Sequence, residues 1–476
     1  MRTKHLIPNH TAGLTYANAY AARGDHHGDG GGAAAVDPFE GFPDAVLGLI
    51  VSKLPFRSAV AASAISRRWR AVLPAAPALD LDFAAAFPAA SRRRTAFAAA
   101  ATAALAGGSQ HPLRRLRLAL DGFFDQFFAA SAAGHVNSWL AAAAARGVQR
   151  LEVHLPRSRL AVLPPSLLAC TDLTSLTIRL DRYAHPLPSL GHLTGLSRLH
   201  LHSVPLDGCH DFFQDLFSHC TQLSCLILEQ CHIGAIRFAG TPRLCSLDIA
   251  NCSWTQHSCI TISETPALRT VRYSGEMANR HIITDADSLD QVVLAIEKPQ
   301  VKLQEHNLRE LLALVGNVRS LVLSPWCIEQ FARPEEWSKV RLDKVRRLAC
   351  IIERREEGAL SIAPLLTSCP SVQELSVSVV PSQSKRRRCS DDEVRYGVIG
   401  GRGAMLRNLR AIRMEYIDES KSGLELVKLL LKNAQMLETM TIVPSMDGLE
   451  QAKFRRRVLK FRKASRNASI QFCASA

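Results

Sequence analysis

The chain has 476 residues, of which 47% are hydrophobic and 21% are charged, a composition typical of globular proteins that excludes a disordered or fibrous chain. Its formal net charge of +15 favours weak association with acidic partners, but no recognised nucleic-acid-binding module accompanies it, so charge alone does not indicate specific nucleic-acid binding. The 13 cysteines are an odd number in a long chain without an export signal, so we expect reduced thiols rather than a disulfide framework.

Residues 1–36 are the first expected segment, a flexible leader rich in glycine, alanine, histidine and aspartate. They lack the continuous apolar core of a secretory signal. The longest bland run, residues 96–106, is far shorter than the roughly 20 apolar residues that a membrane-spanning helix needs. We therefore expect a soluble intracellular protein, in the nucleus, the cytoplasm or both.

The next segment, FPDAVLGLIVSKLPFRSAVAASAISRRWR at residues 42–70, predicts short amphipathic helices. Apolar residues recur at helical spacing until Pro55, which ends the first helix. Ser58 is a candidate N-cap of a second helix and Ser66 of a third. Helices this short cannot bury all their apolar residues among themselves, so they either pack on a larger core or offer a surface to another protein.

Residues 84–146 are dominated by alanine and predict helices that connect this segment to the rest of the chain. From residue 147 to residue 380 a short motif recurs, in which apolar residues occupy the first, fourth and sixth positions. The early copies are about 21–27 residues apart, inside the leucine-rich-repeat range of about 20–29. Nine copies are present: VQRLEVHL, LTSLTIRL, LSRLHLHSVPL, LSCLILEQCHI, LCSLDIANC, LRTVRY, LDQVVL, VRSLVL and VQELSV. The period predicts a solenoid whose strands share one core.

Side chains alternate along a strand, so the residues between the buried leucines should project from the concave face of this solenoid. Many are charged or are histidines, which can make charge-assisted or pH-sensitive contacts with an acidic or phosphorylated partner. The expected substrate-binding residues are Arg150, Glu152, His154, Thr177, Arg179, Arg198, His200, His202, Glu229, Asp248 and Arg272.

Residues 381–404 interrupt the repeats with charge and glycine and are expected to form a linker. Its basic run at residues 385–388 is a candidate nuclear address, although ordinary solvated surface is the simpler interpretation. Residues 405–473 then predict a further helix between two strands, LRAIRM and LETMTI.

The segment at residues 38–80 resembles the F-box. The positions that carry the resemblance, and that it implies as adaptor-binding residues, are Pro43, Leu47, Ile50, Leu54, Ile65, Arg67, Arg68 and Trp69. The ending resembles the FBD region through LKNAQMLETMTI and ASRNASIQF. An F-box, then irregular leucine-rich repeats, then an FBD-like C-terminal region is the order seen in a large plant F-box family.

This resemblance implies an α/β fold, with a short helical F-box followed by a curved leucine-rich-repeat solenoid with parallel strands on its concave face and an FBD-like cap. It implies a non-catalytic substrate receptor that binds a Skp-type adaptor and, through it, a cullin and RING ligase core that ubiquitinates a protein target. A repeat scaffold or nucleic-acid-associated protein, whose F-box acts outside a ligase, is the alternative.

Histidines and cysteines crowd between residues 200 and 232, but they lack the paired C-x2–4-C spacing of structural zinc sites, so no metal is expected. The chain contains no G-x-S-x-G, Walker or H-E-x-x-H motif, so neither a catalytic site nor a cofactor is expected.

Overall fold

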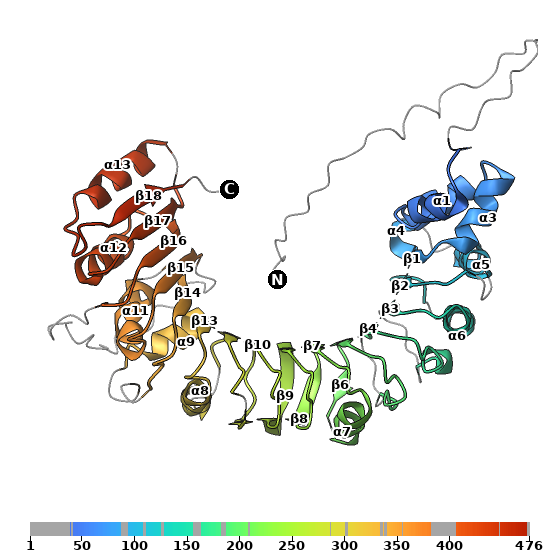
Figure 1. Ribbon diagram of the computed structural model, residues 1–476, viewed down its shortest axis with the longest axis horizontal. Helices are drawn as coiled ribbons and strands as arrows, with labels where there is room; N and C mark the ends of the chain where they lie inside the picture. The colour runs from blue at the N-terminus through green and yellow to red at the C-terminus, as the bar shows by residue number, and fades with distance from the viewer. Residues whose placement is uncertain are drawn as a thin grey trace, which may run out of the picture. The chain divides into compact units, whose positions relative to one another are not determined.

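The computed structural model consists of two compact units, residues 1–43 and residues 44–476, and each is described by itself (Figure 1). The residues that the structure describes are 39, 41–86, 94–107, 111–124, 128–155, 163–181, 187–207, 210–285, 287–299, 303–333, 337, 340–354, 356–381, 406–446 and 448–473. The expected leader and nearly all of the expected linker, including its basic run, lie outside them. In the first unit, Phe42 N–H donates a hydrogen bond to the Phe39 carbonyl.

Three short helices open the second unit: α1 (Asp44–Val51), α2 (Phe56–Ser63) and α3 (Arg67–Ala75). Ser66 caps α3, because its hydroxyl oxygen accepts a hydrogen bond from the Trp69 N–H at 3.2 Å, as the sequence predicts. The prediction of Ser58 as a cap is wrong. Helix α2 begins two residues earlier, directly after Pro55, whose extended backbone turns the chain into the helix.

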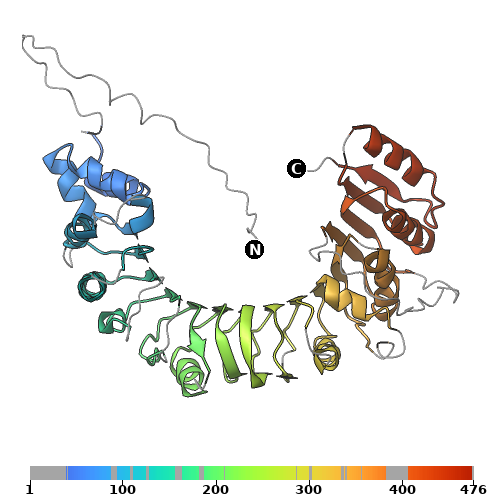
Figure 2. The same ribbon diagram turned by 180° about the vertical axis from the view of Figure 1, so that it is seen from behind.

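Parallel strands, each paired with the next, form one long sheet, here called the first sheet (Figures 1 and 2). In order, its strands are β1 (Ala78–Asp82), β2 (Arg115–Ala119), β3 (Arg150–His154), β4 (Ser175–Arg179), β5 (Arg198–His202), β7 (Cys225–Glu229), β9 (Ser246–Ile262), β10 (Thr270–Gly275), β12 (Gln291–Ile296), β13 (Ser320–Leu323), β14 (Arg347–Glu353), β15 (Glu374–Val380), β16 (Ala411–Ile417), β17 (Thr439–Pro444) and β18 (Ser469–Phe472).

A second, shorter parallel sheet lies in the middle of this unit. It contains β6 (Pro205–Leu206), β8 (His232–Phe238), the later part of β9 and β11 (Arg280–Ile283). The chain turns from the first sheet into the second through stacked residues with positive φ, namely Ser203, Gln230, Asn251 and Gly275. At Gly275 a side chain is impossible, because its Cβ would stand 2.8 Å from the Asn251 Cα at a φ of +89°.

Helices cover the side of the first sheet that faces away from its concave face (Figure 2). They are α4 (Phe83–Ala86), α5 (Arg94–Leu105), α6 (Ala129–Ala145), a 3-10 turn (Pro165–Leu167), α7 (His210–His219), α8 (Leu303–Leu314), α9 (Pro325–Gln330), α11 (Glu356–Ser368), α12 (Lys421–Asn433) and α13 (Gly448–Leu459). Between the strands and these helices runs a continuous core of leucines, such as Leu151, Leu176 and Leu199, that are almost fully buried. This arrangement confirms the predicted α/β fold with parallel strands on the concave face.

Four described strands of the first sheet were not predicted from the sequence, and one of them is β18 near the C-terminus. Strands β1 and β2 lie in or beside a stretch whose composition predicts helices, and β14 ends its motif on Cys350 instead of an aliphatic residue. The FBD-like region continues the same sheet, because Glu374 of β15 pairs directly with Ala411 of β16. Among the described residues, no helix is long and apolar enough to cross a membrane.

Candidate functional site

The three opening helices share a core with the repeats that follow. The Phe56 ring on α2 packs edge-on against Phe97 of α5 with 5.4 Å between centroids, and Phe97 contacts Trp139 of α6 at 6.0 Å. Strand β1 follows α3 almost at once and pairs with β2. The F-box-like helices therefore form the first layer of the solenoid and are not a separate domain on a linker.

Arg146, at the C-terminus of α6, links the opening helices to the first repeats by hydrogen bonds. Its Nε donates to the His111 carbonyl at 2.8 Å and its Nη2 to the Ala76 carbonyl, just after α3, at 3.1 Å. The side chain is almost fully buried, and burial lowers the pKa of Arg146 from its usual value. A charged group is held here by carbonyl oxygens at a helix C-terminus, where positive charge is favourable.

Burial divides the expected adaptor-binding residues into two sets. Leu47 is 0% and Trp69 is 5% exposed, so both belong to the core, and the expectation that they form the adaptor surface is corrected. Ile50 and Leu54 are half-buried against the same core. The physical reason is that α1 packs on α3, while α3 packs on α5 and α2 on β1, which the helix pattern alone does not reveal.

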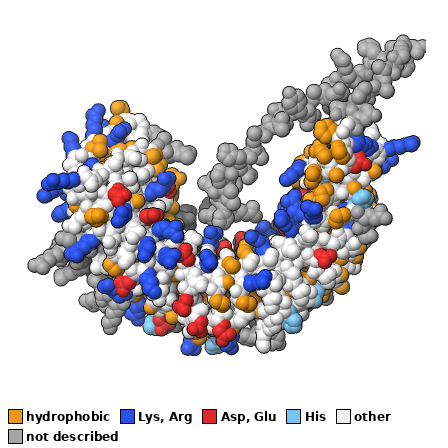
Figure 3. Space-filling view, viewed as in Figure 1, with side chains coloured by type: hydrophobic (Ala, Val, Ile, Leu, Met, Phe, Trp, Pro, Cys, Tyr) orange, Lys and Arg blue, Asp and Glu red, His pale blue; other side chains and the backbone are white. Residues whose placement is uncertain are grey.

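Two large apolar side chains of this segment remain exposed, one on α1 and one in the turn between α2 and α3. Ile65 is 74% and Leu49 is 57% exposed, and hydrophobic side chains gather over this end of the second unit in Figure 3. Pro43 and Arg67 are exposed as well, while Arg68 Nε donates to Asp44 Oδ1 at 2.8 Å. Leu49 is not among the residues predicted from the sequence, although it lies on α1 opposite the buried Leu47, where a residue not needed for the core is expected.

The concave face consists of aligned rows, because the first-sheet strands pair in register. Arg115, Arg150, Ser175 and Arg198 form one row at the start of the strands. The same alignment places Glu152, Thr177 and His200 in a second row. His154, Arg179, His202 and Glu229 form a third. The strand phase predicted from the sequence agrees with these rows for the residues on β3, β4, β5 and β7, but β2, which carries Arg115, was not predicted.

Charges at the N-terminal end of this face are paired with one another. Arg117 Nη1 lies 2.8 Å from Asp80 Oδ1 and 3.1 Å from Asp82 Oδ2, and its Nε lies 3.2 Å from Glu152 Oε1. Partial burial alone would lower the pKa of Arg117, but these hydrogen bonds and charges raise it overall. Of these four residues the sequence predicts only Glu152 on the concave face, because the motif does not reveal the strands that carry the other three.

The Glu229 carboxylate lies close to two histidines. Its carboxylate lies 3.1 Å from His200 Nε2 and 3.8 Å from His202 Nε2. His202 is only 4% exposed, so it is a core residue and not a substrate contact, which corrects the expectation. Burial, with the nearby positive charge of Arg179, lowers the pKa of both His154 and His202, so both favour the neutral form.

The remaining expected residues differ in their exposure and in whether a neighbouring charge pairs with them. Arg179 lies 3.8 Å from Asp181, and burial raises the pKa of Asp248 while the charge of Arg272 opposes that shift. Arg150 and Arg198 are exposed and have no ion pair among the described residues. With Arg272, which meets the same two conditions, these arginines are the members of the predicted set that are most available to a partner.

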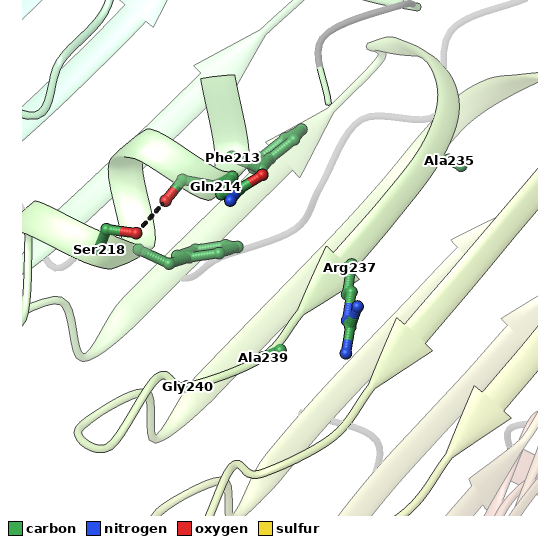
Figure 4. A pocket seen from close by; sticks show the side chains of 8 residues that line it. Phe213, Gln214, Ser218, Ala235, Arg237, Ala239 and Gly240 are labelled. Carbon is green, nitrogen blue, oxygen red and sulfur yellow. Dashed lines mark hydrogen bonds between the residues drawn. The ribbon is translucent and has the colours of Figure 1, made fainter. Parts of the chain in front are cut away.

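A pocket of about 370 Å³ lies elsewhere, between α7 and β8 of the second sheet (Figure 4). Phe213 and Phe217 line it, with Gln214 and Ser218 of α7 and Arg237 of β8 at its borders. In the part of the chain that the structure describes, no group of three or more histidine, cysteine, aspartate or glutamate side chains is placed to hold a metal ion.

Comparison with known proteins agrees with this geometry. A family model described as "At1g61320/AtMIF1, LRR domain" matches residues 106–470, and one described as "F-box domain" matches residues 39–73. The F-box/LRR-repeat protein At1g06630 of Arabidopsis thaliana is 25% identical over 294 residues, which cover 61% of this chain and 71% of that protein.

Two further relatives, also from Arabidopsis thaliana, carry FBD in their names. The F-box/FBD/LRR-repeat protein At1g51370 is 24% identical over 414 residues, covering 85% of this chain and 89% of that protein. The F-box/FBD/LRR-repeat protein At2g26030 is 21% identical over 430 residues, covering 84% and 90%. With an F-box, a matched repeat domain and relatives that span most of its length, the chain belongs to the family of F-box/LRR-repeat proteins.

Proposed function

We propose that this chain is the substrate-recognition subunit of an SCF-type ubiquitin ligase. Its F-box would bind a Skp-type adaptor, and its concave face would hold a protein substrate. The chain would perform no bond chemistry of its own, and would act by raising the effective concentration of substrate lysines near the charged ubiquitin. The observation that carries the proposal is the exposure of two large apolar side chains of the F-box segment, Leu49 and Ile65.

Exposed aliphatic side chains are unfavourable in water unless something covers them, and each fully buried one contributes about 1.5–3 kcal/mol. Other apolar residues of the same segment, Leu47 and Trp69, are already used by the core. The helices are thus held in place by the repeats while the two exposed side chains stay available. An adaptor that covers them would bind a surface formed in advance, which lowers the entropic cost of association.

The shared core supports a second part of the proposal. Because α2 contacts α5 and Arg146 joins α3 to α6, the F-box cannot rotate freely against the first repeats. A substrate on the concave face would be presented at a nearly fixed position relative to the adaptor. Fixed geometry between two binding sites raises the effective concentration of one ligand at the other.

The test is capture of a purified Skp-type adaptor by the full-length chain, comparing the intact protein with a Leu49→Asp, Ile65→Asp double variant. Both residues are exposed, so the variant should unfold like the intact protein and lose adaptor binding by at least about a hundredfold. The matched control is Leu449→Asp on α13, where an 83% exposed leucine lies at the other end of the sheet. The control should bind the adaptor normally.

Full adaptor binding by the folded double variant would overturn the assignment of this surface. Failure of the intact chain to bind any Skp-type adaptor would favour the alternative, a repeat scaffold whose F-box acts outside a ligase.

A further inference from the structure

A row of exposed arginines runs along the edge of the concave face nearest the F-box. Register pairing places Arg115 of β2 beside Arg150 of β3, and Arg198 of β5 follows across Ser175 of β4. These three residues are here called the arginine row. Figure 3 shows lysine and arginine side chains gathered along this inner edge. Arg114, which precedes β2, adds a further exposed positive charge.

The arginine row is not neutralised by the chain itself. No ion pair joins Arg115, Arg150 or Arg198 to a carboxylate within the described ranges. Glu152, the acidic residue two positions beyond Arg150 on β3, is already hydrogen-bonded to Arg117. Arginines on neighbouring strands stand only about 4.8 Å apart, so their charges repel one another until an anion binds between them.

The residue types and their spacing favour a phosphate group. Each guanidinium presents a planar fork of donors that can hold two oxygens of one phosphate, and a phosphoserine carries about −1.5 to −2 charges at neutral pH. The adjacent pair Arg115 and Arg150 is close enough to share one phosphate. Ser175 adds a hydroxyl, and Arg198 is placed for a second acidic group about 10 Å further along.

The size of the row indicates a short peptide and not a nucleic acid. The row ends at β7, where the equivalent position is Cys225, so it spans about 14 Å, or roughly four residues of extended chain. A nucleic-acid groove combines a longer basic track with aromatic side chains on which bases stack. The row position on β4, inside the row, carries Ser175, and those on the following strands β7 and β9 carry Cys225 and Ser246 instead.

We infer that the arginine row binds a short phosphorylated segment of the substrate, so that phosphorylation would decide which proteins this receptor recruits. This inference rests on the proposed function for its biological meaning, but its binding test does not depend on the adaptor. The row also lies on strands that are fixed to the F-box through the shared core, which would place the phosphorylated segment at the adaptor end of the solenoid.

The experiment measures fluorescence polarisation of a labelled degenerate library of extended peptides with a fixed central phosphoserine, titrated with the full-length chain. The same library with serine at the centre, inorganic phosphate and a mixed-sequence single-stranded RNA serve as comparison ligands. We expect the phosphoserine library to bind at least about tenfold more tightly than the serine library. Arg115→Ala and Arg150→Ala should each weaken phosphopeptide binding about tenfold, and Arg198→Ala somewhat less.

Arg347→Ala is the matched control, because Arg347 holds the same register position on β14 but lies 3.8 Å from Asp290. It should bind the phosphopeptides as the intact chain does. Equal binding of the phosphoserine and serine libraries would overturn the inference, as would equal losses for Arg347→Ala and the arginine row variants. Tighter binding of the RNA, with the same arginine dependence, would also overturn it in favour of a nucleic-acid site.

Adaptor capture on the same samples separates this inference from the proposed function. Phosphopeptide binding by a chain that captures no adaptor would refute the ligase role and leave the arginine row intact as a site. Adaptor capture without any phosphopeptide preference would refute phosphopeptide binding by the arginine row and leave the proposed function unaffected.

Discussion

His281, on β11 of the second sheet, is a buried histidine whose two ring nitrogens have no hydrogen-bond partner within the described chain. Its ring lies 5.6 Å from that of Tyr273. Burial lowers the pKa of His281 to about 4, against an ordinary value of about 6.5. The folded protein therefore keeps this side chain neutral at a pH where the unfolded chain binds a proton.

This shift predicts a loss of stability in acid. Above about pH 6.5 the histidine is neutral in both states, and as the pH falls toward 4 only the unfolded state gains a proton, so the free energy of unfolding decreases by up to about 3 kcal/mol. His281→Leu should remove that part of the decrease. Urea unfolding of both proteins between about pH 7 and about pH 4.5 measures it.

His257→Leu is the control for this prediction, since His257 is an exposed histidine on β9. It should leave the acid-induced decrease unchanged. If His281→Leu loses as much stability in acid as the intact chain, the lowered pKa of His281 does not cause the decrease.

The sequence predicts on which face of a strand a residue lies, but it does not predict how deeply that residue is buried. Strand periodicity alone places Arg150 and Arg198 on the open face, and the structure agrees. His202 has the same phase, yet it is buried because Ser203 turns the chain toward the second sheet while Arg179 and Glu229 flank the ring on neighbouring strands. That turn depends on pairing between distant repeats, which a single motif does not encode.

At the scale of elements, the F-box segment buries some of its apolar residues in the shared core and leaves others exposed. The buried and the exposed residues look alike in the sequence, because both are aliphatic or aromatic residues in or beside the predicted helices. Which residues are covered depends on β1 and α5, whose packing is set by Phe56 and Phe97. The sequence therefore predicts that these helices exist and that they bind a partner, but not which residues are left for it.

The buried and the exposed residues should respond differently to truncation. Trp69→Ala should lower the free energy of unfolding by about 3–5 kcal/mol, because it empties a buried site in the shared core. Ile65→Ala removes a side chain that is 74% exposed, so it should leave stability nearly unchanged while weakening adaptor capture. Urea unfolding and adaptor capture, run on both variants, check the separation.

The reverse pattern, with Ile65→Ala unfolding the chain or a stable Trp69→Ala that loses only the adaptor, would show that the buried and the exposed residues are wrongly assigned.

Across the whole second unit, one continuous first sheet joins the F-box, the repeats and the FBD-like region. The repeat motif predicts this sheet where its strands end on aliphatic residues. At β1 only Leu79 and Leu81 of the motif remain inside ALDLD, and the complete copy LRRLRL that carries β2 lies within an alanine-rich stretch. Alanine is a strong helix former, and local propensity hides a strand that only pairing with its neighbours reveals.

The most direct test of the account is affinity capture from plant cells treated with a proteasome inhibitor, comparing the intact chain with the Leu49→Asp, Ile65→Asp variant. We predict that the intact chain retains a Skp-type adaptor and a cullin and that the variant loses both. A shared set of other proteins should remain with both baits, because the concave face is unchanged. Retention of adaptor and cullin by the folded variant, or their absence from the intact chain, would contradict the assignment of this chain as a ligase receptor that uses this surface.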